Sequence, residues 1–120
     1  MLIWRTLLCT LLACGLFAQG AADWKIAVKA PEKLKAGHDM PFEVRLTDAK
    51  GAPVAGADVE LVLTMIDMDH GEQKKQAKES KPGIYSGTQQ FLMVGGWNLE
   101  VRARKGSAST KQSFRYEVKE

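Results

Sequence analysis

The segment MIDMDHG, residues 65–71, carries two thioethers, one imidazole and two carboxylates within a short span. Methionine sulfur is a soft ligand that favours Cu(I), and imidazole binds several transition metals. Met68 and His70 are two residues apart, so in an extended segment their side chains point to the same side. Met65 joins them only if the chain turns after Ile66. The residue types therefore indicate a copper site, with Cu(I) favoured over Cu(II), and a weak site for zinc.

Each of these residues also has an interpretation that involves no metal. Met65 continues a row of apolar residues in the preceding segment and would then belong to the core. His70 stands before Gly71 and would be an ordinary turn residue. Met68 lies in a polar loop, where packing gives no reason for a methionine. The negative charge of the neighbouring aspartates favours any bound cation, so the combination points to a metal more than any single residue does.

Segments of alternating apolar and polar residues must position this loop. In FEVRLTD, residues 42–48, the apolar residues Phe42, Val44 and Leu46 share one face. This period of two is typical of half-buried antiparallel strands. It recurs in the segments WKIAVKA, ADVELVLTMI, WNLEVRARK and TKQSFRYEV, which are residues 24–30, 57–66, 97–105 and 110–118.

Turn-forming residues separate these predicted strands. Glycine and proline interrupt residues 48–59, and the Lys-Pro-Gly turn at 81–83 leads into a short strand at 84–88. The charged segment EQKKQAKES, residues 72–80, fits either a polar edge strand or a short helix. Short strands separated by turns at this spacing predict an all-β fold, an immunoglobulin-like antiparallel β-sandwich of about seven strands.

A further candidate ligand lies in FLMVGGW, residues 91–97. Alternation would place Phe91, Met93, Gly95 and Trp97 on one face. Met93 is then either a core residue or a ligand, because the run reaches a Gly-Gly pair near the predicted mouth of the sandwich. The predicted ligand set is Met65, Met68, His70 and Met93.

The other histidine of the chain, His38, stands beside Asp39 and Met40. These residue types are also metal ligands, but they come directly before the strand that begins at Phe42. We therefore expect His38 to lie in a turn and leave it out of the ligand set.

Residues 1–22 have the organisation of a secretory signal peptide, with Arg5 before an apolar run and small residues after it. The apolar run is shorter than the roughly 20 residues of a membrane-spanning helix. Cleavage is expected after Gly20 or Ala22. Residues 23–120 would then form a single domain, because so short a chain holds one core.

The leader predicts a periplasmic or secreted protein. Two alternatives would attach it to a membrane: retention of residues 1–22 as an anchor, or lipidation of Cys14 within the sequence LLAC. Both cysteines, Cys9 and Cys14, lie in the leader. The domain therefore has no thiolate ligand, and a metal site must use methionine, histidine and carboxylate.

Composition and motifs argue against several classes of function. The formal net charge is only +3, and basic residues are scattered among acidic ones, so nucleic-acid binding has little support. The chain has two histidines, no Gly-x-Ser-x-Gly elbow, no phosphate-binding glycine loop and no dinucleotide fingerprint. We therefore expect no enzymatic activity and no tightly bound small-molecule substrate.

The segments TMIDMDHG (64–71), PGIYSG (82–87) and FLMVGGWNLEV (91–101) resemble the YtkA-like domain family, which includes FixH-like proteins. The resemblance runs from about Pro41 to about Val101. It implies an exported or membrane-anchored β-sandwich that accompanies copper-handling and cytochrome-oxidase assembly proteins. The family pattern has a proline after its first methionine, whereas this chain has Ile66. The family's methionine and histidine positions fall on Met65, Met68, His70 and Met93.

The resemblance and the donor set lead to one expectation and one alternative. The expectation is an extracytoplasmic copper-binding module, a Cu(I) chaperone or accessory protein in copper handling or oxidase assembly. Its ligand would be a copper ion and its partner another envelope protein. The alternative is a non-catalytic interaction module without a metal, which binds an envelope protein through strand edges or loops.

Overall fold

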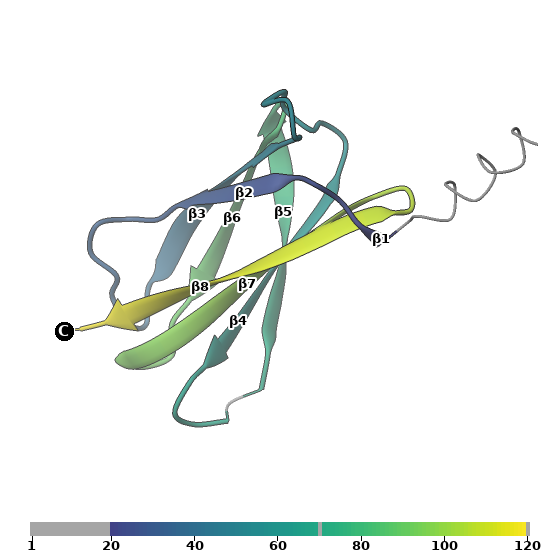
Figure 1. Ribbon diagram of the computed structural model, residues 1–120. Coiled ribbons are helices and arrows are strands. Elements are labelled where there is room, and N and C mark those ends of the chain that lie inside the picture. Colours follow the sequence, from purple (N-terminus) through teal and green to yellow (C-terminus); the bar gives the residue numbers. More distant parts are fainter. Residues whose placement is uncertain (1–19, 70, 120) are drawn as a thin grey trace, which may run out of the picture.

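The computed structural model describes residues 20–69 and 71–119, which fold as an all-β sandwich (Figure 1). This confirms the predicted fold class, with seven long strands and one strand of two residues. The strands are β1 Gly20–Ala21, β2 Lys25–Lys29, β3 Asp39–Thr47, β4 Asp58–Met65, β5 Gln73–Lys81, β6 Ile84–Gln90, β7 Gly95–Lys105 and β8 Ala108–Val118.

The strands form two sheets that share β5. Their order is β1-β8-β7-β4-β5-β6-β3-β2, and every pair is antiparallel except β1 with β8. Residues 73–77 of β5 pair with β4, whereas its residues from Lys78 onward pair with β6. The charged segment 72–80 is therefore a strand, and it forms an edge of each sheet in turn.

The core lies between the sheets and follows the predicted alternation. Phe42, Val44 and Leu46 of β3 are at most 2% exposed. Aromatic side chains fill one end of the core, where the rings of Phe91 and Trp97 meet edge to face with centroids 5.5 Å apart. Burial of this kind stabilises each large apolar side chain by about 1.5–3 kcal/mol. The other buried apolar residues include Ile26, Val59, Leu61, Leu63, Tyr85, Leu99, Val101 and Val118.

The prediction for the run from Phe91 to Trp97 was wrong at Met93. Residues 92–94 form a bend, and Met93 is 38% exposed instead of facing the core. The indole N–H of Trp97 donates to the carbonyl oxygen of Met93 at 3.0 Å, which closes the bend. Gly95 has φ of +135°, a conformation that suits glycine and does not continue a regular strand. Alternation therefore stops at Phe91 and resumes at Trp97.

The predicted leader falls largely outside the described residues. Its cleavage, its retention as an anchor and lipidation at Cys14 stay predictions. Of the leader, Gly20 and Ala21 form β1, which pairs with Ala108 and Ser109 of β8. In the described ranges, no helix is long and apolar enough to cross a membrane.

The long loop after β3 is held against β5 and β6 by polar side chains. The two carboxylate oxygens of Glu79 accept hydrogen bonds from the N–H groups of Gly56 and Gly83, at 3.0 and 3.1 Å. The Tyr85 hydroxyl donates to the carbonyl oxygen of Val54 at 2.7 Å and accepts from the N–H of Ala57 at 2.9 Å. The side chains of Glu79 and Tyr85 thus supply hydrogen-bond partners for backbone groups of the loop, in place of those that a neighbouring strand would supply.

We predict that Glu79 makes folding stability depend on pH in the acid range. The hydrogen bonds from Gly56 and then Gly83 hold the pKa of Glu79 below its ordinary value of 4.5. A carboxyl group whose pKa is lowered by folding stabilises the folded protein at any pH above its pKa in the unfolded chain. This stabilisation is lost as the pH falls through its pKa in the folded protein. Urea unfolding should therefore show a lower free energy of unfolding for Glu79→Gln than for wild type at neutral pH. This difference should shrink under acid conditions. A difference that stays constant with pH would contradict this role.

We predict that Gly83→Ala destabilises the fold more than Gly106→Ala does. Both glycines have positive φ, of +79° and +63°. A Cβ on Gly83 would also lie 2.5 Å from Cβ of Pro53, whereas a Cβ on Gly106 meets nothing within 4 Å. Chemical denaturation should show a loss of about 2–4 kcal/mol for Gly83→Ala and about 1–2 kcal/mol for Gly106→Ala. Equal losses would show that contact with Pro53 is unimportant.

Candidate metal site

The pairing of β4 with β7 brings two loops to one end of the sandwich. Met65, the last residue of β4, lies opposite Trp97 near the start of β7. Beyond this pair, the N–H of Ile66 donates to the carbonyl oxygen of Gly96 at 3.0 Å. The β4–β5 loop, residues 66–72, therefore leaves the sheet beside the β6–β7 loop, residues 91–94.

Met65 lies at the base of these loops and is half-buried against the core. A Cβ built on Gly95 would stand 2.8 Å from Cε of Met65, so the methyl end of the thioether rests against the Gly95 backbone. Glycine leaves the room that this contact requires. Met65 thus packs against the core, and its thioether lies next to the β6–β7 loop, while its role as a ligand stays a prediction.

Met68 and Met93 lie on the two loops and are exposed. Met68 is 51% exposed in a bend, and Met93 is 38% exposed. Their neighbours Ile66, Leu92 and Val94 are exposed as well, at 41%, 52% and 47%. We call these five residues the apolar tip. They comprise every exposed large hydrophobic residue identified in the described ranges, and clustered exposed apolar groups mark binding sites.

His70 lies outside the described residues, so its place relative to Met68 and Met93 stays a prediction. A hydrogen bond joins the residues on either side of it. The N–H of Gly71 donates to Oδ1 of Asp69 at 2.9 Å, and Gly71 has φ of +76°. Asp69 therefore uses one carboxylate oxygen to hold the loop.

A second histidine, His38, lies close to the end of the sandwich that carries the β4–β5 and β6–β7 loops. The sequence did not predict this position. The N–H of Gly37 donates to the carbonyl oxygen of Phe91 at 2.7 Å, and Nε2 of Gln90 donates to the carbonyl oxygen of Gly37 at 3.0 Å. His38 is exposed and lies in a bend, as predicted. Its position beside the strand that leads into the β6–β7 loop depends on contacts between residues far apart in the sequence.

The donors at this end include the sulfur atoms of Met65, Met68 and Met93. Within residues 20–69 and 71–119, no group of three or more His, Cys, Asp or Glu side chains is placed to hold a metal ion. Methionine sulfur is a ligand that favours Cu(I).

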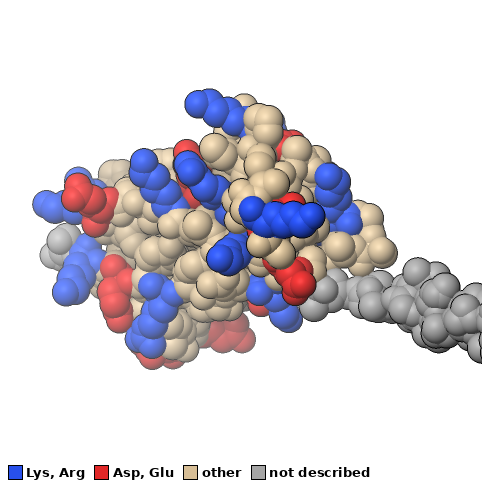
Figure 2. Space-filling model, turned by 45° about the horizontal axis from the view of Figure 1, so that its top comes forward, with Lys and Arg blue, Asp and Glu red and all other residues tan. Residues whose placement is uncertain are grey.

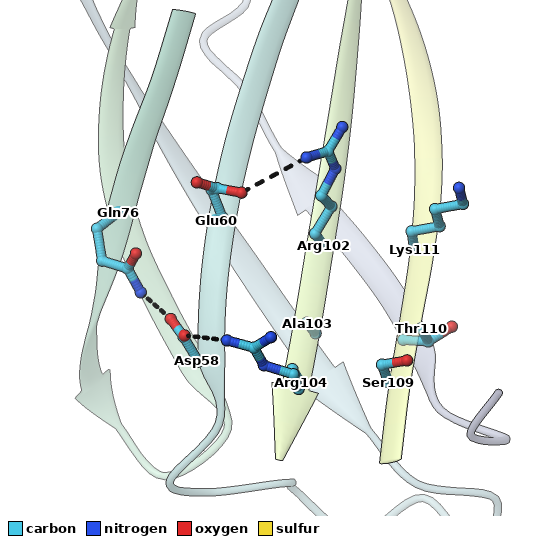
Figure 3. A pocket seen from close by; sticks show the side chains of 9 residues that line it. All are labelled: Asp58, Glu60, Gln76, Arg102, Ala103, Arg104, Ser109, Thr110 and Lys111. Atoms are coloured by element: carbon cyan, nitrogen blue, oxygen red, sulfur yellow. Dashed lines mark hydrogen bonds and ion pairs between the residues drawn. The ribbon is translucent and has the colours of Figure 1, made fainter. Parts of the chain in front are cut away.

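An open groove of about 720 Å³ lies on the outer face of β4, β5, β7 and β8 (Figure 3). Its charges largely pair with one another: Arg102 lies 3.7 Å from Glu60, and Arg104 lies 3.4 Å from Asp58. Figure 2 likewise shows basic and acidic side chains intermixed on the face in view. The groove is therefore an open surface on which basic and acidic side chains alternate.

Two solved structures share the fold. The Lin-41 filamin domain matches with a TM-score of 0.54 and 14% identity, over 84% of this chain and 96% of that domain. MtrC from Shewanella baltica OS185 matches with a TM-score of 0.53 and 11% identity, over 78% of this chain and 22% of that one. At such low identity these likenesses show the fold alone. No curated protein matched the chain.

The sequence profile of the YtkA-like family matches residues 18–102. The match spans both loops of the candidate site and most of the strands that position them. It confirms the resemblance predicted from the sequence, while the closer relation to FixH-like proteins stays a prediction. This chain therefore belongs to the YtkA-like family.

Proposed function

We propose that this protein is an extracytoplasmic copper-binding module that holds Cu(I) between its β4–β5 and β6–β7 loops. Met68 and Met93 supply thioether ligands, His70 supplies an imidazole, and Met65 is the fourth candidate ligand. The observation that carries the proposal is the placement of two exposed methionines on two loops that the β4–β7 pairing sets side by side.

The chemistry of the donors supports this proposal. A methionine in a core contributes packing, but Met68 and Met93 are exposed and contribute little of it. Thioethers bind Cu(I) without the thiolates that form disulfides in an oxidising compartment. The domain would thus hold a soft metal outside the cytoplasm, where the predicted leader directs it.

The openness of the site supports a role in copper transfer. Two or three donors on exposed loops leave coordination positions that a partner's ligands can enter, so the partner can displace the donors one at a time. Asp67 and Asp69 add negative charge beside the ion. This exchange suits a chaperone or accessory protein in copper handling or oxidase assembly.

A second candidate function rests on the apolar tip. The same five side chains would suit a metal-free module that docks onto another envelope protein. The two functions differ in what they require of Met68 and Met93: copper needs the sulfur, whereas docking needs only the apolar surface.

We predict that Met68→Leu, Met93→Leu and His70→Ala each weaken Cu(I) binding by at least about tenfold, because losing even a supporting partner of a metal ligand costs about 10–100-fold. Leucine keeps the apolar volume of methionine and removes only the sulfur. The measurement is a Cu(I) titration of the exported protein against a chromophoric chelator under reducing conditions.

Leu92→Ala is the matched control for this titration. Leu92 is exposed in the same loop as Met93 but has no donor atom, so its truncation should leave Cu(I) affinity unchanged. Failure of the wild-type protein to compete with the chelator would rule out the copper function. Unchanged binding by both leucine variants would remove Met68 and Met93 from the site.

A further inference from the structure

The outer edge of β8 is open along most of its length. β7 pairs with the other edge of β8 from Ala108 to Val118 without a register shift. On the outer edge, β1 pairs only with Ala108 and Ser109. In the part of the chain that the structure describes, no other strand bonds to this edge. Residues 110–118 therefore form a regular, unpaired strand edge.

The bond to β1 shows which backbone groups face this edge. The carbonyl oxygen of Ser109 accepts a hydrogen bond from the N–H of Ala22 at 2.8 Å, so the peptide groups of Ser109 point away from β7. In an antiparallel pair the direction alternates from residue to residue. The N–H and C=O groups of Lys111, Ser113, Arg115 and Glu117 therefore point outward. Such a row of unpaired groups is a template for another strand.

We propose that this edge pairs with β8 of a second copy of the chain, antiparallel and with a two-fold axis beside Phe114. The two sheets that contain β5, β4, β7 and β8 would then join into one continuous sheet across the dimer. Such a contact is isologous, because both copies use the same surface. Phe114 is the centre of the open stretch 110–118, so this register uses the whole stretch.

Charge favours the same register. With the axis at Phe114, Lys111 lies opposite Glu117 of the partner subunit, and symmetry makes this favourable pair twice. With the axis at Ser113, Lys111 would lie opposite Arg115 of the partner subunit, and like charges directly opposite are destabilising.

The inner face of β8 also suits this pairing. Phe114 and Tyr116 are only partly buried, although both pack against the core. At the proposed axis, Phe114 lies opposite Phe114 of the partner subunit in a non-hydrogen-bonded pair, where side chains approach most closely. Aromatic cross-strand pairs are favourable contacts in sheets. The other outer strand, β2, is five residues long with lysine at both ends, so it is a poorer template.

The test is sedimentation velocity of the exported protein over a range of concentrations, with Ser113→Pro and Ser113→Ala. We expect the wild-type protein and Ser113→Ala to show a reversible monomer–dimer equilibrium. Ser113→Pro should be monomeric at the same concentrations, because it removes an outward N–H that the monomer does not use. Thermal unfolding checks that the proline variant is folded.

A charge exchange tests the register without a backbone change. Lys111→Glu and Glu117→Lys should each weaken the dimer by about tenfold, since each creates two like-charge pairs, and the double variant should restore it. A wild-type protein that is monomeric at every concentration would overturn the proposal. A dimer that neither Ser113→Pro nor the single charge reversals weaken would overturn it as well.

Discussion

The register between β4 and β7 is the constraint on which the functional end of this protein depends. It runs unbroken from Asp58 opposite Arg104 to Met65 opposite Trp97. A slip of one residue would turn the buried Leu61 outward and bring the charged Glu60 into the core, so burial fixes the register. The same register decides that the two methionine-bearing loops leave the sheet side by side.

The aromatic end of the core explains why the apolar tip is exposed. Phe91 and Trp97 are both buried and in contact, so the chain between them must leave the core and return over a short distance. The bond from the Trp97 indole to the Met93 carbonyl fixes this excursion. Met93 and its two neighbours are thus held outward by buried residues on both sides, which gives a loop near the surface a rigid base.

The strands could be predicted from the sequence because alternation along residues 42–48 and 97–105 directly reflects burial on one face. The bend at 92–94 could not be predicted from the sequence, because an apolar run of that length occurs both in strands and in exposed turns. The division of β5 between two sheets and the approach of His38 to Phe91 depend on long-range pairing. Local pattern carries no information about such pairing. Met65 could be placed at the end of the sandwich because β4 keeps its alternation to its last residue, whereas Met93 lies in the bend that alternation did not predict.

X-ray absorption spectroscopy at the copper edge of the Cu(I)-loaded protein would identify the atoms that bind the ion. We expect thioether sulfur scatterers together with an imidazole nitrogen, and loss of one sulfur scatterer in Met68→Leu or Met93→Leu. A first coordination shell of nitrogen and oxygen alone would contradict this expectation. Such a result would show that the exposed methionines serve as apolar surface and that any copper is bound elsewhere.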